Sequence, residues 1–152
     1  MIQEDKELLL KDLCSRLPYE VIGKCELDAS YDTSFDTIFQ THKFDAVVYG
    51  LKEDLLLVTP LIEDMDEQEF ANEEVVDGVD ILDFIPYLFP LSSMTDEQKM
   101  FLKQQNWCIA ISTSGTVETT IEGIDWLNKN HFDYRGIIEK GLAIDATNLN
   151  IY

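Results

Sequence analysis

Residues 95–122, TDEQKMFLKQQNWCIAISTSGTVETTIE, pass from a helical pattern to a hairpin pattern within one stretch. The TDEQ start matches a capping box, in which the Thr95 hydroxyl accepts a hydrogen bond from the backbone N–H of Gln98 and the Gln98 side chain reaches back. Two carboxylates follow Thr95, where the helix dipole favours negative charge. The pattern predicts a helix from Asp96 to Gln105.

The second half of the stretch predicts a β-hairpin. Trp107 to Ser112 and Thr116 to Glu122 are rich in β-branched residues, and they flank Thr113-Ser114-Gly115. Glycine supplies the positive φ that a tight turn requires. A helix followed directly by a hairpin is typical of α+β folds rather than of alternating βαβ units.

The first half of the chain contains one helical pattern followed by strand patterns. Leucines recur at helical spacing from Glu4 to Leu17, and Pro18 ends the run. Short β-branched and aromatic runs then alternate with turn-forming residues, which predicts an antiparallel sheet of hairpins. The predicted strands are Val21 to Leu27, Phe35 to Gln40, Lys43 to Tyr49 and Asp54 to Thr59, with connections at Asp28 to Ser34 and Gly50 to Glu53.

The C-terminal part predicts further helices. Pro86 and Pro90 forbid a long helix in the apolar run Ile81 to Leu91, which can form one helical turn or an extended stretch. Ile124 to Asn130 is expected to be a short helix. Asp133 is expected to cap a final helix through Lys140, with Gly141 as its terminator and with Ile137, Ile138 and Leu142 facing inward.

These elements predict a single α+β domain over residues 1–152. Its antiparallel sheet of hairpins packs with an N-terminal helix, a middle helix and C-terminal helices. A chain of 152 residues buries enough surface to fold without disulfides or a structural metal. Cys14, Cys25 and Cys108 are odd in number and far apart, so we expect buried free thiols and a reducing compartment.

The charge of the chain is concentrated in one region. Between Glu53 and Gln98 there are 14 carboxylates and neither Lys nor Arg, whereas the rest of the chain carries 16 acidic and 11 basic residues. Such a field repels phosphate, so direct nucleic-acid or anionic-membrane binding is disfavoured. We predict an acidic, mobile connection at residues 63–80. Its candidate partner-binding acidic face comprises Glu63, Asp64, Asp66, Glu67, Glu69, Glu73, Glu74, Asp77 and Asp80.

No catalytic, cofactor or metal motif is recognisable in the sequence. His131 has no His, Cys or carboxylate three or four residues further on, and we expect it to hydrogen-bond a turn carbonyl; His42 has Asp45 alone at this spacing, which does not make a metal site. The acidic run starting at Asp64 lacks the glycine and the bidentate glutamate of an EF-hand loop. The sequence contains no nucleophile elbow and no phosphate-binding glycine loop. We therefore predict no catalytic residues, no cofactor and no metal site. The sequence does not exclude that two of the 30 acidic residues act together as a general acid and a general base.

Aromatic residues gather in two places. Phe84 to Phe89 forms one group, and Trp126, Phe132 and Tyr134 form another. Aromatic side chains dominate the hot spots of protein interfaces, but they also fill cores. We expect these residues to serve the core.

The N-terminal sequence shows no signal peptide, and no segment of the chain approaches the length of about 18 apolar residues needed to cross a bilayer. We expect a cytoplasmic protein that is not embedded in a membrane.

Three segments resemble a family of small uncharacterised proteins of gut bacteria and their phages and mobile elements. The segments are LLLKDLCSRLPY at 8–19, PLSSMT at 90–95 and DWLNKNHFDYRGIIEKGLA at 125–143. The resemblance covers both ends of the chain and part of its middle. It implies a setting in a phage or mobile element and carries no activity or site residue.

The expected function is that of a non-enzymatic accessory factor whose acidic face binds a basic protein surface. In a narrower version, the carboxylates imitate DNA phosphates, which are spaced about 1.7 Å apart along the duplex axis, and inhibit a nucleic-acid-binding protein. The alternative is a small hydrolase that uses unpatterned carboxylates.

Overall fold

The computed structural model describes residues 3–32, 37–53, 55–61, 78–107, 109–111 and 117–152. Within these ranges the helices are α1 (Gln3–Arg16), α3 (Asp96–Gln104) and α4 (Ile121–Lys129), with single 3-10 turns η1 (Leu17–Tyr19), η2 (Ile81–Asp83) and η3 (Leu91–Ser93). The strands are β1 (Val21–Asp32), β2 (Thr37–Lys52), β3 (Leu55–Leu61), β4 (Val79–Asp80), β5 (Phe84–Pro90), β6 (Ala110–Ile111), β7 (Val117–Glu118), β8 (Phe132–Asp133) and β9 (Ile144–Asp145).

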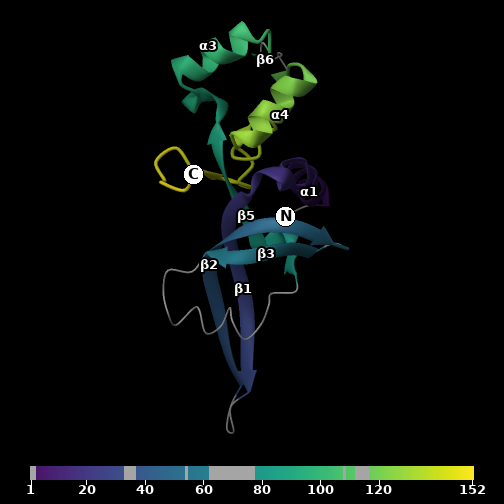
Figure 1. The fold of residues 1–152 in the computed structure, drawn as a ribbon. Coiled ribbons are helices and arrows are strands. Elements are labelled where there is room, and N and C mark those ends of the chain that lie inside the picture. The colour runs from purple at the N-terminus through teal and green to yellow at the C-terminus, as the bar shows by residue number, and fades with distance from the viewer. Residues whose placement is uncertain (1–2, 33–36, 54, 62–77, 108, 112–116) are drawn as a thin grey trace.

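The main sheet has the order β4-β3-β2-β1-β5-β8, with β9 also paired to β5. The pairs from β4 to β5 are antiparallel, whereas β8 and β9 join β5 in parallel. Figure 1 shows this sheet in the middle of an elongated molecule, with α3 and α4 at one end. The structure thus confirms an α+β fold with a mostly antiparallel sheet. The division of residues 1–152 into one domain stays a prediction.

The hairpin of β1 and β2 is longer than the sequence predicts. Residues 28–32 continue β1, and β2 runs unbroken through the predicted gap between Gln40 and Lys43. Ladder hydrogen bonds along the long partner strand outweigh the turn preference of the polar residues in this stretch. Seven residue pairs, from Glu26 with Lys43 to Asp32 with Thr37, extend past the strands that flank the hairpin. This two-stranded arm is about 20 Å long and leaves the sheet at the end opposite α3 (Figure 1).

The first of two hydrophobic cores lies between α1 and one face of the main sheet. Alternate residues of β1, β2 and β3 point to α1, because side chains alternate across a strand. They form one buried cluster with α1 and the loop after β8. Its fully buried members include Leu9, Leu13, Val21, Cys25, Ala46, Leu56, Val79, Phe84, Leu88 and Ile137.

A second core lies between α3, α4 and β8. Met94, Leu102, Leu127, Phe132 and Tyr134 are buried there. The aromatic group at Phe84–Phe89 also turns inward, with Phe84, Tyr87 and Leu88 buried. The expectation that these aromatic residues serve the cores is confirmed.

The predicted hairpin after α3 is present but short. β6 and β7 pair over two residues each, and the predicted turn at 113–115 lies outside the described residues. Ile121 and Glu122 belong to α4 instead of the second strand, because the Thr120 hydroxyl accepts a hydrogen bond from the N–H of Gly123 and starts the helix there. The predicted short helix is confirmed with this earlier start.

The predicted final helix from Asp133 to Lys140 is wrong. Residues 137–141 form turns, and Asp133 lies in β8. The Asp133 carboxylate accepts hydrogen bonds from the backbone N–H groups of Arg135, Ile137 and Ile138, which resembles a helix cap. Gly136, however, has a φ of 68° and breaks the helical path inside the first turn. Ile137 and Leu142 are buried as predicted.

The cysteines differ from the prediction in one respect. Cys14 and Cys25 are free thiols, as expected, but Cys14 is exposed, because it lies on the outer side of α1. Burial raises the pKa of the Cys25 thiol to about 12. Cys108 lies outside the described residues.

The capping box of α3 is formed as predicted. The Gln98 N–H donates to the Thr95 hydroxyl at 3.2 Å, and the Thr95 N–H donates to the Gln98 side chain at 2.8 Å. Replacing Thr95 by Ala is expected to lower the free energy of unfolding by about 1 kcal/mol, because one N–H of the helix start loses its acceptor. Urea denaturation measures the loss. Thr95→Ser keeps the hydroxyl and is the control; an equal loss in both variants would contradict the capping explanation.

Candidate functional site

The predicted acidic face is described only at its end. Asp80 lies in β4 opposite Leu55, and its carboxylate accepts a hydrogen bond from the Leu82 N–H at 2.9 Å. Lys6 of α1 lies 3.6 Å from the same carboxylate. Asp80 therefore caps η2 and contacts α1. The remaining eight candidates lie outside the described residues, so the acidic face as a whole stays a prediction: Glu63, Asp64, Asp66, Glu67, Glu69, Glu73, Glu74 and Asp77.

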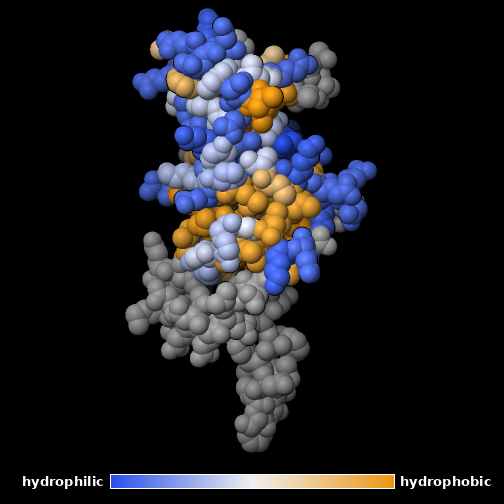
Figure 2. Space-filling view, turned by 45° about the vertical axis from the view of Figure 1, so that its right-hand side comes forward, coloured by the Kyte–Doolittle hydropathy of each residue, from blue (hydrophilic) through white to orange (hydrophobic). Residues whose placement is uncertain are grey.

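An apolar surface lies on the side of the sheet that faces away from α1. We call it the outer β face and define it by Val47, Tyr49, Leu55, Leu57 and Leu61. Tyr49 is 56% exposed and Leu61 is 46% exposed, and Val47 and Leu57 are half-buried. Figure 2 shows apolar surface at the height of β2 and β3. A solvated face of an antiparallel sheet normally carries polar side chains, so this composition is unusual.

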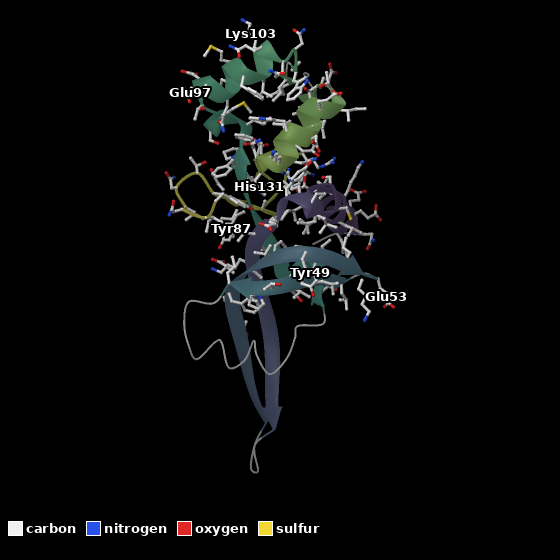
Figure 3. The ribbon with its side chains drawn as sticks, viewed as in Figure 1. Tyr49, Glu53, Tyr87, Glu97, Lys103 and His131 are labelled. Carbon is white, nitrogen blue, oxygen red and sulfur yellow. The ribbon has the colours of Figure 1, made fainter. Side chains whose placement is uncertain are left out.

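Carboxylates lie beside the outer β face. Asp45 stands opposite Leu61 in the ladder, and exposed Glu53 lies in the turn between β2 and β3. Figure 3 shows Tyr49 and Glu53 on this pair of strands. The Tyr87 hydroxyl donates to Asp45 at 2.7 Å, and burial together with this carboxylate raises the pKa of Tyr87. Asp45 is thereby held in place at the edge of the apolar surface.

A buried ionic cluster joins α1 to the second half of the chain. The Asp12 and Arg16 side chains are fully buried and form two hydrogen bonds, at 2.7 and 3.1 Å. Arg16 also donates to the Phe132 carbonyl at 2.8 Å, and its guanidinium lies over the Tyr134 ring. Nε of Arg135 lies 3.2 Å from the Asp12 carboxylate. The cluster contains one carboxylate and two guanidinium groups and therefore carries one net positive charge.

A cavity of about 440 Å³ lies between β5, the start of α3, the end of α4 and the C-terminal residues. It is lined by Phe89, Ser93, Thr95, Gln98, Lys129, Asn130, His131, Phe132, Thr147 and Tyr152. The volume is within the range of pockets that bind small molecules. Figure 3 shows His131 where the base of α4 approaches the sheet.

His131 is the buried ionisable residue of this cavity. It is 8% exposed, and its ring stacks on Tyr152 with centroids 3.9 Å apart. Burial, with a smaller effect of the positive charge on Arg16, lowers the pKa of His131 to about 4. The imidazole is therefore neutral near pH 7. Nδ1 is buried without a hydrogen-bond partner, so the predicted bond to a turn carbonyl is not made by this nitrogen.

The sequence indicates one of these sites but not the other. Three consecutive leucines in a strand must place apolar side chains on both faces, so the sequence of β3 already contains the signal for the outer β face. The cavity brings together residues from Phe89 to Tyr152 with no common motif. Among the described residues, no group of three His, Cys, Asp or Glu side chains is arranged to hold a metal ion.

None of the helices in the described ranges has the length and apolar composition to span a bilayer. Comparison with protein-family models, curated proteins and solved structures finds no match to this chain.

Proposed function

We propose that this protein is a non-enzymatic binding protein whose outer β face receives another protein with a basic surface. The observation that carries the proposal is the row of leucines on the solvent side of β3. The family resemblance described above makes an accessory factor of a phage or mobile element the proposed biological setting.

The leucine row supports an interface for a physical reason. Leu55, Leu57 and Leu61 lie on one side of β3, with Val47 and Tyr49 beside them on β2. Exposed apolar side chains that form a continuous surface mark sites of protein interaction, whereas single exposed ones are ordinary. Each fully buried leucine contributes about 1.5 to 3 kcal/mol through removal of apolar area from water. Covering this face would therefore supply a useful part of a binding free energy.

Charge decides which kind of partner fits. Asp45, Glu53 and Lys52 border the outer β face, and the whole chain carries a formal net charge of −19. Complementary charges steer association and exclude partners of like charge. The proposed partner therefore presents aliphatic side chains surrounded by Lys or Arg. In the narrower form of this proposal, the partner is a nucleic-acid-binding protein, and the carboxylates occupy its binding surface in place of DNA.

Selection from a random peptide display library tests the chemistry of the partner directly. We expect the enriched peptides to combine aliphatic residues with Lys or Arg. Binding of a selected synthetic peptide should weaken about tenfold or more in the double variant Leu55→Ser/Leu61→Ser, because the apolar contact is lost. It should also weaken when NaCl rises from about 0.05 M to about 0.3 M. Calorimetric titration measures both effects.

Ile121→Ser is the matched control. Ile121 is the first residue of α4, is 86% exposed and lies away from the outer β face, so this variant should bind like the unchanged protein. Enrichment of acidic peptides, or equal losses in the control and the double variant, would contradict the proposal. A dimer in light scattering that the double variant abolishes would assign the face to a second copy of this chain instead.

A further inference from the structure

The cavity beside His131 has the composition of a small-molecule site, and nothing in the proposed protein-binding role uses it. Its apolar wall is aromatic. Phe89 lies 6.1 Å from Phe132 and 5.9 Å from Tyr152 between ring centroids. Tyr152 in turn stacks on His131. Planar rings pair favourably with aromatic side chains in stacked or edge-to-face arrangements.

The wall is held in place by the backbone around it. The Phe89 N–H donates to the His131 carbonyl at 2.9 Å, which ties β5 to the turn after α4. The Tyr152 hydroxyl donates to the Tyr87 carbonyl at 3.0 Å, which fixes its ring over the cavity. His131 has a φ of 56°, a conformation that costs free energy for a residue other than glycine. A residue keeps such a strained backbone conformation only where surrounding contacts enforce it, and such residues concentrate at active and ligand-binding sites.

The polar part of the lining favours an anion. Lys129 has the charged side chain among the ten lining residues, and none of their side chains is acidic, although the chain has 30 acidic and 11 basic residues. Gln98 uses its side-chain oxygen in the capping box, which leaves its amide N–H groups as donors at the cavity. Buried Nδ1 of His131 has no partner, and an unsatisfied buried polar atom costs about 1 to 3 kcal/mol. Because the His131 imidazole is neutral, it does not repel an anion.

We infer that this cavity binds a small aromatic carboxylate, with the ring against Phe89, Phe132 and Tyr152 and the carboxylate facing Lys129. Lys129 donates to the carboxylate, and Gln98 supplies a second donor. The partner-binding outer β face and this cavity are separate sites, because none of the residues that define the former lines the latter.

Binding of naphthoate, followed by amide chemical shifts in NMR titrations, tests the inference. We expect shifts centred on Gln98, Lys129 and His131. Neutral naphthamide should bind about fivefold more weakly than naphthoate, because it cannot pair with an exposed ammonium group. Cyclohexanecarboxylate should also bind more weakly, because it cannot stack on the aromatic wall.

The variant Lys129→Gln should reduce naphthoate affinity about fivefold and leave naphthamide affinity unchanged. Lys103→Gln is the matched control: each lysine is in the last turn of its helix, Lys103 in α3 and Lys129 in α4, but Lys103 is not a lining residue. Figure 3 shows Lys103 far from His131. The inference is overturned if naphthoate causes no shifts around His131 at millimolar concentration, if the shifts map elsewhere, or if acid and amide bind equally.

Discussion

Replacing Asp12 by Ala is expected to lower the free energy of unfolding by about 3 to 5 kcal/mol. Asp12 is the carboxylate of a cluster that otherwise contains Arg16 and Arg135. Without it, the fully buried guanidinium of Arg16 keeps its bond to the Phe132 carbonyl but loses both ionic hydrogen bonds. An unpaired charge in a buried environment is costly because no water replaces the lost partner. Chemical denaturation followed by circular dichroism measures the loss.

An exposed ion pair provides the control for this prediction. Glu26 and Lys43 lie 2.9 Å apart on neighbouring strands, and both side chains are more than half exposed. Glu26→Ala should therefore cost less than about 1 kcal/mol. The double variant Asp12→Leu/Arg16→Met should recover part of the stability lost by Asp12→Ala, because it removes both charges and fills the space with apolar atoms. If the double variant were less stable than Asp12→Ala, the loss would come from packing and not from the uncompensated charge.

Acidification is expected to destabilise the protein through His131. The pKa of His131 is about 4 in the folded protein against 6.5 for an unperturbed histidine. Between these values the unfolded chain binds a proton that the folded protein does not, so the free energy of unfolding falls as the pH decreases. The stabilising contribution is fully present above about pH 6.5 and is lost progressively down to about pH 4. Its size is at most about 3 kcal/mol.

The variant His131→Asn isolates this effect. Asn tolerates the positive φ at this position and does not titrate. The variant also loses the stacking on Tyr152, so its stability at neutral pH is expected to be lower. The informative quantity is the slope of stability against pH, which should be smaller in the variant between about pH 6.5 and about pH 4. Identical slopes would show that carboxylates alone cause the acid sensitivity.

Elements governed by local chemistry are the ones that the sequence predicts well. The capping box at Thr95 and Gln98 lies within four residues, and the structure contains both of its hydrogen bonds. Leucine spacing likewise predicts α1 to within one residue at each end. Pro86 and Pro90 exclude a long helix, and both lie in β5.

Two errors in the predicted fold have the same physical origin. At Asp133 a correct capping signal is followed by Gly136 in a left-handed conformation, and packing of Ile137 into the core decides the path of the chain. In β2 the polar residues after Gln40 favour a turn locally, but pairing with β1 carries the strand through. Contacts between distant residues override local preference in both cases.

The candidate sites were predictable to different degrees. The apolar character of β3 is visible in Leu55-Leu56-Leu57, and only its position on the outer face required the structure. The ionic cluster depends on Arg16 reaching Phe132, which is 116 positions away in the chain. Arg16 looks like an ordinary polar residue at the end of a helix, because sequence spacing contains no information on such a contact.

The two hydrophobic cores make the position of Arg16 important for cooperativity. Arg16 ends α1, which packs on the sheet core, yet its side chain bonds to β8, which packs in the core of α3 and α4. Opening either half alone would break the hydrogen bond from Arg16 to the Phe132 carbonyl and leave a buried charged donor unsatisfied, so this bond couples the two halves into one unfolding unit. Trp107 and Trp126 both pack in the core of α3 and α4. Loss of this coupling in Arg16→Met would therefore separate the tryptophan fluorescence transition from that of circular dichroism, which reports on the whole chain.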